Sequence, residues 1–255
     1  MSDRKPPTVL RGVPDCPDGE VPWISVAQMR AVDRETIGLG LDLARMMENA
    51  GANLAWLARG LLGGDVAGRR VTVLAGRGGN GGGGLVAARR LTGWGALVDV
   101  RLAAEPSELA PVPRQQLEIL RAMDTPTFVG AADLSPPELL IDAILGYSQQ
   151  GSPRAAVAYL IAVAHTVAAA RDTPVLSLDV PSGLELDDGM VHEPAVRATA
   201  TMTLALPKAG LRVDGARSLV GELYLADVSI PPVVYEHLGI RYRSPFTRGP
   251  IVRLK

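Results

Sequence analysis

Cysteine is nearly absent from this chain of 255 residues, and its scarcity excludes several kinds of structure. Cys16 is the only cysteine, so no disulfide can form within the chain and no metal site can be built from several cysteines. This usage fits a reducing compartment, and we expect a cytoplasmic protein. Residues 1–19 are polar and rich in proline, and they lack the apolar stretch of a secretory signal peptide.

The chain also has almost no net charge of either sign. The formal net charge is −1 at pH 7, whereas electrostatic binding to nucleic acid or to a membrane surface needs a clear positive excess. The longest apolar run, residues 155–170, is rich in alanine and shorter than the roughly 20 residues that span a bilayer. We therefore expect neither a nucleic-acid partner nor a membrane partner, and we interpret the run as a buried helix.

Glycine, by contrast, is abundant and concentrated in one segment. It fills seven of the nine positions 76–84, interrupted only by Arg77 and Asn80. An apolar stretch at 71–75 precedes the segment and is typical of a buried strand, and an amphipathic helical pattern follows from residue 85. This order brings bare backbone N–H groups and a helix N-terminus to a ligand, usually a phosphate. A tight turn alone needs a single glycine, so the segment favours a nucleotide-like ligand.

Two nucleotide-binding motifs can be tested against this segment. A P-loop ends in Gly-Lys-Ser or Gly-Lys-Thr, and residues 83–85 contain neither a lysine nor a hydroxyl. The dinucleotide fingerprint G-x-G-x-x-G matches at Gly76, Gly78 and Gly81, but in so glycine-rich a segment composition alone produces that match. The acidic residue that should follow about twenty positions later is Asp99, which falls in the middle of a predicted strand. The fingerprint therefore carries little weight.

The rest of the chain predicts one α/β domain behind a short tail. Residues 1–23 hold five prolines and little periodicity, and we interpret them as a mobile or loosely docked tail. A Ser-x-x-Gln capping box at Ser25 predicts the first helix, and no linker divides residues 24–255. The remaining strands are apolar without strict alternation, which predicts a mainly parallel sheet covered on both faces. Strands are expected at 96–102, 127–129, 139–145, 175–180, 201–206 and 222–228, and helices at 25–37, 42–62, 114–123 and 155–170.

Three polar groups fall at or just beyond the C-terminal ends of predicted strands. Asn80 follows the first strand, Asp142 lies in the apolar run LLIDAIL, and Ser182 lies in the sharp exit DVPSG. In an open parallel sheet these ends share one edge, where ligands bind. Oxygen atoms from the three side chains suit a hard cation, although the spacing does not select the ion. For Asp142 and Asp179 the alternative is a carboxylate that caps an ordinary turn.

The three histidines, His165, His192 and His237, are scattered along the chain. None has a partner at the spacing of a metal site or of a catalytic triad, and no G-x-S-x-G motif is present. We interpret His165 as a helix residue and the other two as surface residues, and we do not expect nucleophilic catalysis.

Short motifs in a fixed order carry a family resemblance. They are MRAVD at 29–33, MENAG at 47–51, the glycine segment at 76–89, IDAILG at 141–146, GYSQQG at 146–151, LDVPSG at 178–183 and PKAG at 207–210. They are similar to M-x-x-x-D, M-E-N-A-G, G-x-G-N-N-G-G-D-G-L-V-A-A-R, V-D-A-x-F-G, the animal-type G-F-S-x-x-G, D-I-P-S-G and P-K-x-G. From about residue 25 to residue 231 the chain therefore resembles the NAD(P)H-hydrate epimerase family, also called the YjeF N-terminal domain.

The resemblance implies a fold and an activity. The fold is a three-layer α-β-α Rossmann-like sandwich, often a homodimer. The activity interconverts the R and S forms of hydrated NADH or NADPH, so that a separate NAD(P)H-hydrate dehydratase can repair both. The dehydratase domain that is fused to many bacterial members is not expected in 255 residues.

The resemblance also implies roles for single residues. Potassium ligands match Asn80, Asp142 and Ser182, and Asp179 is the expected acid/base. Lys208 is expected near the crevice, where its charge would neutralise a phosphate or Asp179; a solvated turn lysine is the alternative. The hydrated cofactor is expected to contact Gly79, Asn80, Gly81, Gly82, Gly83, Gly146, Tyr147, Ser148, Gln149, Gln150, Gly151, Ser152 and Asp179.

Two positions depart from the family pattern. Gly79 stands where the family usually has Asn, and Gly83 stands where it has Asp. Both lie in the ligand segment, so we expect catalysis to be weakened while the ion site is kept. This leaves open a non-catalytic, nucleotide-sensing or protein-binding member of the same fold. A nicotinamide-dependent oxidoreductase is the remaining alternative, although the chain shows no Tyr/Lys or His/Asp catalytic pair.

Overall fold

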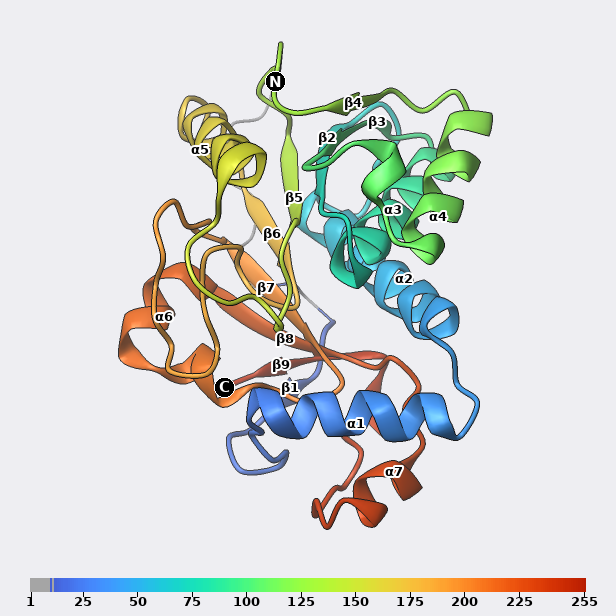
Figure 1. Cartoon of the computed structure of the whole chain (residues 1–255), viewed down its shortest axis with the longest axis vertical. Helices are drawn as coiled ribbons and strands as arrows, with labels where there is room; N and C mark the ends of the chain where they lie inside the picture. Colours follow the sequence, from blue (N-terminus) through green and yellow to red (C-terminus); the bar gives the residue numbers. More distant parts are fainter. Residues whose placement is uncertain (1–9, 11) are drawn as a thin grey trace.

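A central sheet organises residue 10 and residues 12–255, the part of the chain that the structure, a computed structural model, describes. Its strands are β1 (Asp15–Cys16), β2 (Arg70–Ala75), β3 (Leu97–Leu102), β4 (Thr127–Val129), β5 (Leu139–Ala143), β6 (Val175–Leu178), β7 (Ala200–Leu204), β8 (Glu222–Ala226) and β9 (Ile251–Leu254). The order in the sheet is β1-β9-β8-β7-β6-β5-β2-β3-β4 (Figure 1). Every neighbouring pair is parallel except β8 with β9, which confirms the predicted, mainly parallel sheet.

Helices cover both faces of this sheet. They are α1 (Val26–Gly38), α2 (Leu43–Leu61), α3 (Gly79–Gly93), α4 (Pro111–Ala122), α5 (Ala155–Ala169), α6 (Asp214–Val220) and α7 (Pro232–His237). The apolar sides of α2, α3 and α4 pack with β2, β3 and β5 in one large core cluster, while α5 packs on the opposite face. The expected three-layer α-β-α arrangement is therefore confirmed (Figure 1). Among the described residues, no helix combines the length and the apolar character needed to cross a membrane.

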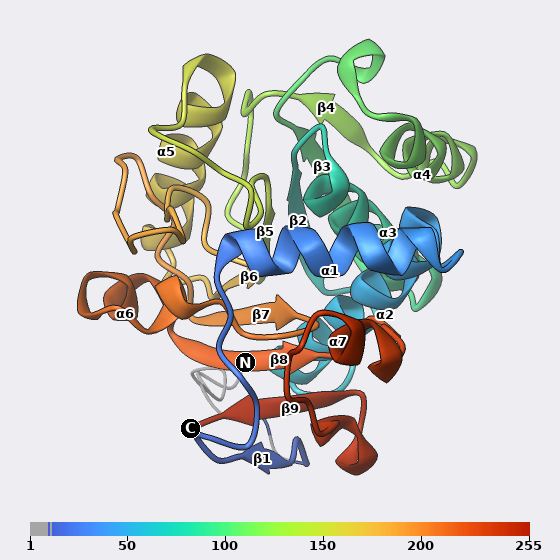
Figure 2. The same cartoon turned by 60° about the horizontal axis from the view of Figure 1, so that its bottom comes forward.

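The first helix begins as its capping box predicts. The Ser25 hydroxyl accepts a hydrogen bond from the Gln28 backbone N–H at 3.1 Å, and the Gln28 side chain accepts one from the Ser25 N–H at 2.9 Å. Met29 and Val32 are buried among residues that follow β7 and β8, so α1 lies beside α7 and across the ends of those strands (Figure 2). This packing carries Asp33 to the same end of the sheet.

The glycine segment is mostly helical, which differs from the loop that the sequence predicts for it. Gly78 is the N-cap of α3, and the helix begins at Gly79, six residues before the expected start at residue 85. Glycine is a poor helix former, but here it permits close packing against α2. A Cβ atom on Gly51 of α2 would lie 2.4 Å from the Val86 Cβ and 2.7 Å from the Gly83 carbonyl oxygen. The tight contact between these helices explains why small residues occur on both.

The described part of the N-terminal tail is docked, so the expectation of a mobile or loosely docked tail is wrong there. Asp15–Cys16 forms β1, which pairs in parallel with β9. Leu10, Cys16 and Val21 are buried in core clusters, which explains the docking although their spacing shows no period. Residues 1–9 and 11 lie outside the described residues.

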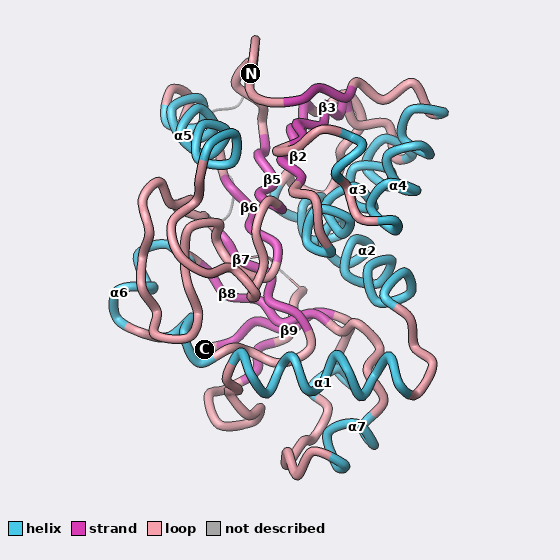
Figure 3. Tube along the Cα trace, in the orientation of Figure 1, coloured by secondary structure: helices cyan, strands magenta, loops and turns pink. Residues whose placement is uncertain are grey.

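The second half of the sheet is joined by irregular segments and sharp turns. Residues 179–199, which join β6 to β7, contain neither a helix nor a strand (Figure 3). The predicted strands at 175–180, 201–206 and 222–228 each end two residues earlier than expected. After β6 and β7 the chain turns sharply at Asp179 and Ala205, which both have positive φ. Three short elements, β9, α6 and α7, were not expected from the sequence pattern.

Candidate active site

A cleft of about 1110 Å³ opens beyond the carboxyl ends of β2, β5, β6 and β7. This is the edge at which a parallel sheet binds ligands, as the sequence predicts. Apolar side chains from α1 and α2, among them Met29 and Met47, line one part of the cleft, and polar groups converge on the rest. Most of the expected ligand residues line it: Gly79, Asn80, Gly83, Gly146, Tyr147, Ser148, Gln149, Gln150, Gly151, Ser152 and Asp179, together with Lys208.

Gly81 and Gly82 are the exceptions among the expected ligand residues, because neither lines the cleft. A Cβ atom on Gly81 would lie 1.8 Å from the Gly76 carbonyl oxygen, and one on Gly82 would lie 2.2 Å from the Met47 sulfur. Gly81 is therefore required, because its Cβ would meet backbone, whereas a side chain at Gly82 would have to displace the flexible end of Met47. We call residues 76–80 and Gly83, which do face the cleft, the glycine wall.

The two departures from the family pattern lie in different surroundings on the glycine wall. A Cβ atom on Gly79 would find only the tip of Leu43, at 3.9 Å, so a larger side chain has room there. A Cβ atom on Gly83 would lie 2.8 Å from the Leu178 Cδ2 methyl, so Leu178 fills part of the space that an aspartate needs. Neither glycine has a positive φ, and the backbone does not oppose substitution at either position.

Asp142 is completely buried below the cleft floor. Its carboxylate accepts hydrogen bonds from the Ser177 hydroxyl at 2.9 Å, the Ser182 N–H at 2.9 Å and the Ser182 hydroxyl at 2.6 Å. Burial raises the pKa of Asp142, and within the described part of the chain no basic side chain pairs with it. A buried carboxylate without a positive partner is costly, so this site suits an added cation.

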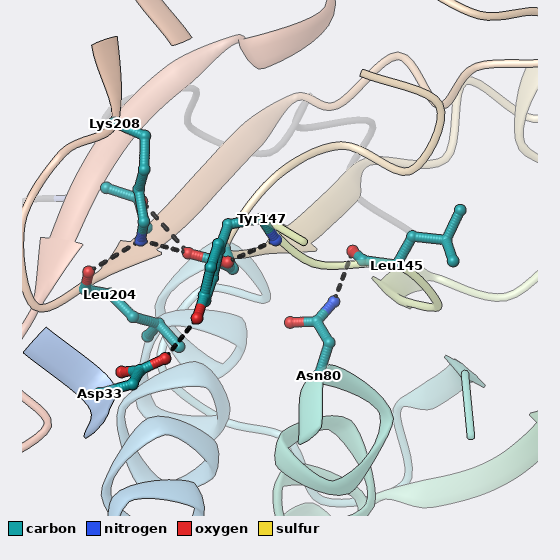
Figure 4. Close-up of polar contacts among 8 residues, drawn as sticks. Asp33, Asn80, Leu145, Tyr147, Leu204 and Lys208 are labelled. Atoms are coloured by element: carbon teal, nitrogen blue, oxygen red, sulfur yellow. Dashed lines mark hydrogen bonds and ion pairs between the residues drawn. The ribbon is translucent and has the colours of Figure 1, made fainter. Parts of the chain in front are cut away.

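Leu145 connects the three residues expected to bind that cation. Its backbone N–H donates to the Ser182 hydroxyl at 3.0 Å, and its carbonyl accepts from the Asn80 side-chain amide at 2.7 Å (Figure 4). Asn80 lines the cleft, whereas Asp142 and Ser182 do not. The structure thus brings the three together around one backbone segment and places two of them beneath the cleft surface.

Asp179 and Lys208 form a buried ion pair at the cleft, with 2.6 Å between the Lys208 Nζ and the Asp179 carboxylate. Their side chains are only 5% and 1% exposed, respectively. Asp179 also accepts a hydrogen bond from the Tyr147 N–H at 2.9 Å, and Lys208 also donates to the Leu204 carbonyl at 2.9 Å (Figure 4). Lys208 is thus in the crevice against Asp179, as expected, and is not a solvated turn lysine.

Asp33 and Tyr147 extend this ion pair, and the sequence analysis gave neither a part in acid/base chemistry. The Tyr147 hydroxyl donates to the Asp33 carboxylate (Figure 4). Burial raises the pKa of Asp33, and burial and the neighbouring Asp33 raise the pKa of Tyr147, so the hydroxyl keeps its proton. Asp33 was visible in the MRAVD motif, which was the only signal for it. We call Asp33, Tyr147, Asp179 and Lys208 the acid network.

A second pair, Glu185 and His192, supports the cleft from the 179–199 connection. The His192 Nε2 lies 2.7 Å from a Glu185 oxygen, which also accepts from the Gly151 N–H at 2.9 Å. The Ser152 hydroxyl lies 3.4 Å from the His192 Nδ1. The interpretation of His192 as a surface residue is therefore wrong, since its side chain is 15% exposed and engaged on both nitrogens.

The other residues singled out from the sequence lie away from the cleft. His165 lies on α5, as expected, but it is exposed, so the expectation of a buried helix is wrong for that side of α5. His237 is half exposed and pairs with Glu35. Asp99 accepts a hydrogen bond from Thr72 and pairs with the Arg101 guanidinium, and it does not line the cleft. The G-x-G-x-x-G match therefore lacks its acidic ribose ligand at Asp99, which agrees with the little weight given to the fingerprint.

Comparisons with known proteins agree with the motif order. The family model described as YjeF-related protein N-terminus matches residues 43–210. An NAD(P)H-hydrate epimerase of Dehalogenimonas lykanthroporepellens is 42% identical over 240 residues, covering 91% of this chain and 92% of the relative. An NAD(P)H-hydrate epimerase of Truepera radiovictrix is 36% identical, covering 85% of this chain and 94% of the relative.

Longer relatives and one solved structure complete the comparison. The bifunctional NAD(P)H-hydrate repair enzyme Nnr of Salinibacter ruber is 36% identical over 84% of this chain, which spans 42% of that relative. The crystal structure of the yeast protein ynu0 superposes with a TM-score of 0.75 at 25% identity, covering 92% of this chain and all of the yeast chain. The similarity thus extends over nearly the whole chain in both sequence and fold.

Proposed function

The chain belongs to the family of YjeF-related protein N-termini, and we propose that it interconverts the R and S forms of hydrated NADH and NADPH. The observation that carries the proposal is the buried Asp179–Lys208 pair at the wall of a large cleft. Epimerisation inverts one carbon that bears a hydroxyl and is neither an oxidation nor a reduction. It therefore needs proton transfer and a shaped pocket, and needs no electron acceptor.

Asp179 is the proposed acid/base. When the carbon–nitrogen bond of the ring opens, the hydroxyl oxygen loses its proton as the carbonyl forms, and a carboxylate within reach takes that proton and returns it when the ring closes on the other face. The Tyr147 N–H and the Lys208 ammonium hold this carboxylate in one orientation. Lys208 compensates its charge, which makes an ionised carboxylate tolerable at so buried a position.

The cleft-facing residues of the glycine wall and of the segment 146–152 are the proposed binding surface for the hydrated dinucleotide. A wall of glycine leaves backbone N–H groups open to a phosphate. The alternative of a non-catalytic member is not favoured, because relatives matched over more than nine-tenths of their length are named epimerases and the Asp179–Lys208 pair is intact here.

The direct test combines the purified protein with both hydrate epimers and a dehydratase specific for the S form. We expect complete consumption of both epimers, faster than their spontaneous interconversion. An Asp179→Asn variant serves as the matched control. If the R form persists as it does with the dehydratase alone, the proposed activity is wrong.

Potassium is the proposed ion at Asn80, Asp142 and Ser182. The donor set is a carboxylate, an amide and a hydroxyl, which suits a hard cation, and the bound ion would neutralise Asp142 and order the segments that follow β5 and β6. Binding to the folded state raises the melting temperature, so we expect a higher Tm in potassium than in sodium at equal ionic strength. Identical melting curves in both salts, with Asp142→Asn equally insensitive, would exclude the site.

Three further proposals concern the dehydratase, the oligomeric state and the cellular location. We propose that the S form passes to a dehydratase on a separate chain, whereas the longer relatives are named as bifunctional repair enzymes. The chain spans about two-fifths of the bifunctional relatives, whose second activity is not transferred to it. We also propose that the protein is a homodimer, which light scattering of the purified protein tests. A cytoplasmic location is the third proposal, and fractionation of the source cells tests it.

A further inference from the structure

Arg77 is the only charged side chain in the glycine segment 76–84. Arg77 lies between β2 and α3, belongs to the residues that line the cleft and is exposed. The Ala110 N–H donates to the Arg77 carbonyl at 3.0 Å, which anchors the backbone at this position. The backbone of Arg77 is therefore held in place, and its long side chain can extend into the cleft.

The Arg77 guanidinium has no partner among the described residues. Three arginines of neighbouring elements are engaged: Arg89 and Arg90 both bind Glu48, and Arg101 binds Asp99. Among the described residues Arg154, on the opposite wall of the cleft, is exposed and without a side-chain partner like Arg77. Glu105 and Glu108 also line the cleft, and the Glu108 carboxylate accepts a hydrogen bond from the Glu105 backbone N–H at 3.0 Å. An arginine left free on a cleft wall can bind an incoming oxyanion through two parallel hydrogen bonds.

Because Gly79 and Gly83 replace the polar residues of the family pattern, the glycine wall has few side chains that can contact a ligand. With glycine at both positions, only Arg77 and Asn80 carry polar side chains on the glycine wall. The Asn80 amide is already bound to the Leu145 carbonyl at 2.7 Å. A polar side chain on the opposite wall, Gln149, is engaged as well.

Gln149 holds its own wall together. Its side-chain oxygen accepts from the Gly183 N–H at 2.9 Å, and its side-chain nitrogen donates to the Gly151 carbonyl at 3.4 Å. Using it for the ligand would break one of the links between the segment 146–152 and the 179–199 connection. Arg77 can contact a ligand without breaking any existing contact.

We propose that Arg77 is a substrate-binding residue that contacts a phosphate group of the hydrated dinucleotide. The inference rests on the proposed function, because it assumes that this dinucleotide enters the cleft. Its anionic groups are the pyrophosphate, present in both substrates, and the 2′-phosphate, present only in the NADPH form. Either presents the oxygen pair that a guanidinium binds in two-point fashion.

The test compares Arg77→Gln with Arg34→Gln, which removes the same charge from an exposed arginine of α1 that does not line the cleft. For Arg77→Gln we expect KM to rise about tenfold while kcat stays within about twofold, because the contact is equal in ground and transition states. A similar rise for both substrates assigns the contact to the pyrophosphate, and a rise confined to hydrated NADPH assigns it to the 2′-phosphate. Arg77→Lys should recover part of the loss, and Arg34→Gln should change nothing.

Binding of ADP-ribose and of 2′-phospho-ADP-ribose, measured by calorimetry, tests the same contact without turnover. We expect the affinity of at least one of them to fall about tenfold in Arg77→Gln at an unchanged melting temperature. Unchanged KM values and unchanged affinities overturn the role of Arg77. If the wild-type protein binds these ligands but does not epimerise the hydrates, the proposed function fails while the phosphate contact stands.

Discussion

The two sides of the cleft are built in opposite ways. The acid network is closed: Asp179 and Lys208 are buried, each has several partners, and Asp33 and Tyr147 bind each other. The glycine wall is open, with backbone on its surface and a single free charge at Arg77. A closed network fixes the position of a proton, and an open wall accommodates a ligand. Substitutions should therefore change the rate and the stability on one side and the affinity on the other.

The largest expected effect comes from Asp179→Asn, which keeps the shape of the side chain and removes the base. The epimerisation rate should fall by roughly 10² to 10⁴, the range typical of losing a general acid/base. The rate is measured in the coupled dehydratase assay, with the circular-dichroism spectrum as a check of the fold. Undiminished turnover in a folded variant would contradict the assignment.

Lys208→Met should reduce stability more than any substitution on the glycine wall. It leaves the Asp179 carboxylate buried without its cation, and breaking a buried pair in this way costs about 3–5 kcal/mol. Urea denaturation measures the loss. The double variant Asp179→Asn with Lys208→Met should recover part of it, since no unpaired charge remains. Two losses that simply add would show that the pair is not coupled.

On the open side, Gly79→Asn combined with Gly83→Asp restores the family residues. If the new carboxylate accepts a hydrogen bond from the dinucleotide, affinity should rise by about 1.5–3 kcal/mol, or roughly 10- to 150-fold. Gly79→Asn alone is the control, because only position 83 requires the Leu178 methyl to move. A folded double variant that binds no better would mean that this wall recognises its ligand by another geometry.

The smallest expected effect concerns Asp33 and pH. Because burial raises the pKa of Asp33 above its ordinary value of 3.8, the folded state keeps a proton that the unfolded state has released. The contribution of Asp33 to stability is therefore full below about pH 4 and is lost as the pH rises through the raised pKa. Asp33→Asn should flatten this decline in urea denaturation between pH 4 and 7. An equally steep decline in the variant would show that Asp33 does not cause it.

Much of the fold could be predicted because buried parallel strands have a simple pattern. The apolar runs at 71–75 and 139–145 each contain a strand of the sheet, and Ser25 starts α1 through a local contact. Asp142 and Asp179 were found for the same reason, since a polar residue in or directly after an apolar run is conspicuous. The two residues lie at the same edge of the sheet because β5 and β6 are parallel neighbours.

The remainder depends on contacts between distant segments, which leave no periodic signal. Asp33 and Tyr147 are 114 residues apart, and only the folded chain brings them together. His192 lies in an irregular connection, so nothing in its sequence neighbourhood pointed to Glu185 as its partner in the fold. The early start of α3 was missed because the low helix propensity of glycine is outweighed by close packing against α2.

The edge of the sheet at β1 has a consequence for the order in which the protein is made. β1 pairs with β9, and the Arg248 side chain binds the Asp15 carbonyl, 233 positions earlier in the chain. During translation, residues 15–16 leave the ribosome long before residues 251–254 exist, so β1 has no strand to join until synthesis is almost complete. β1 therefore cannot enter the sheet before β9 has been made, and Cys16 cannot reach its buried position beside Val252 of β9 until then.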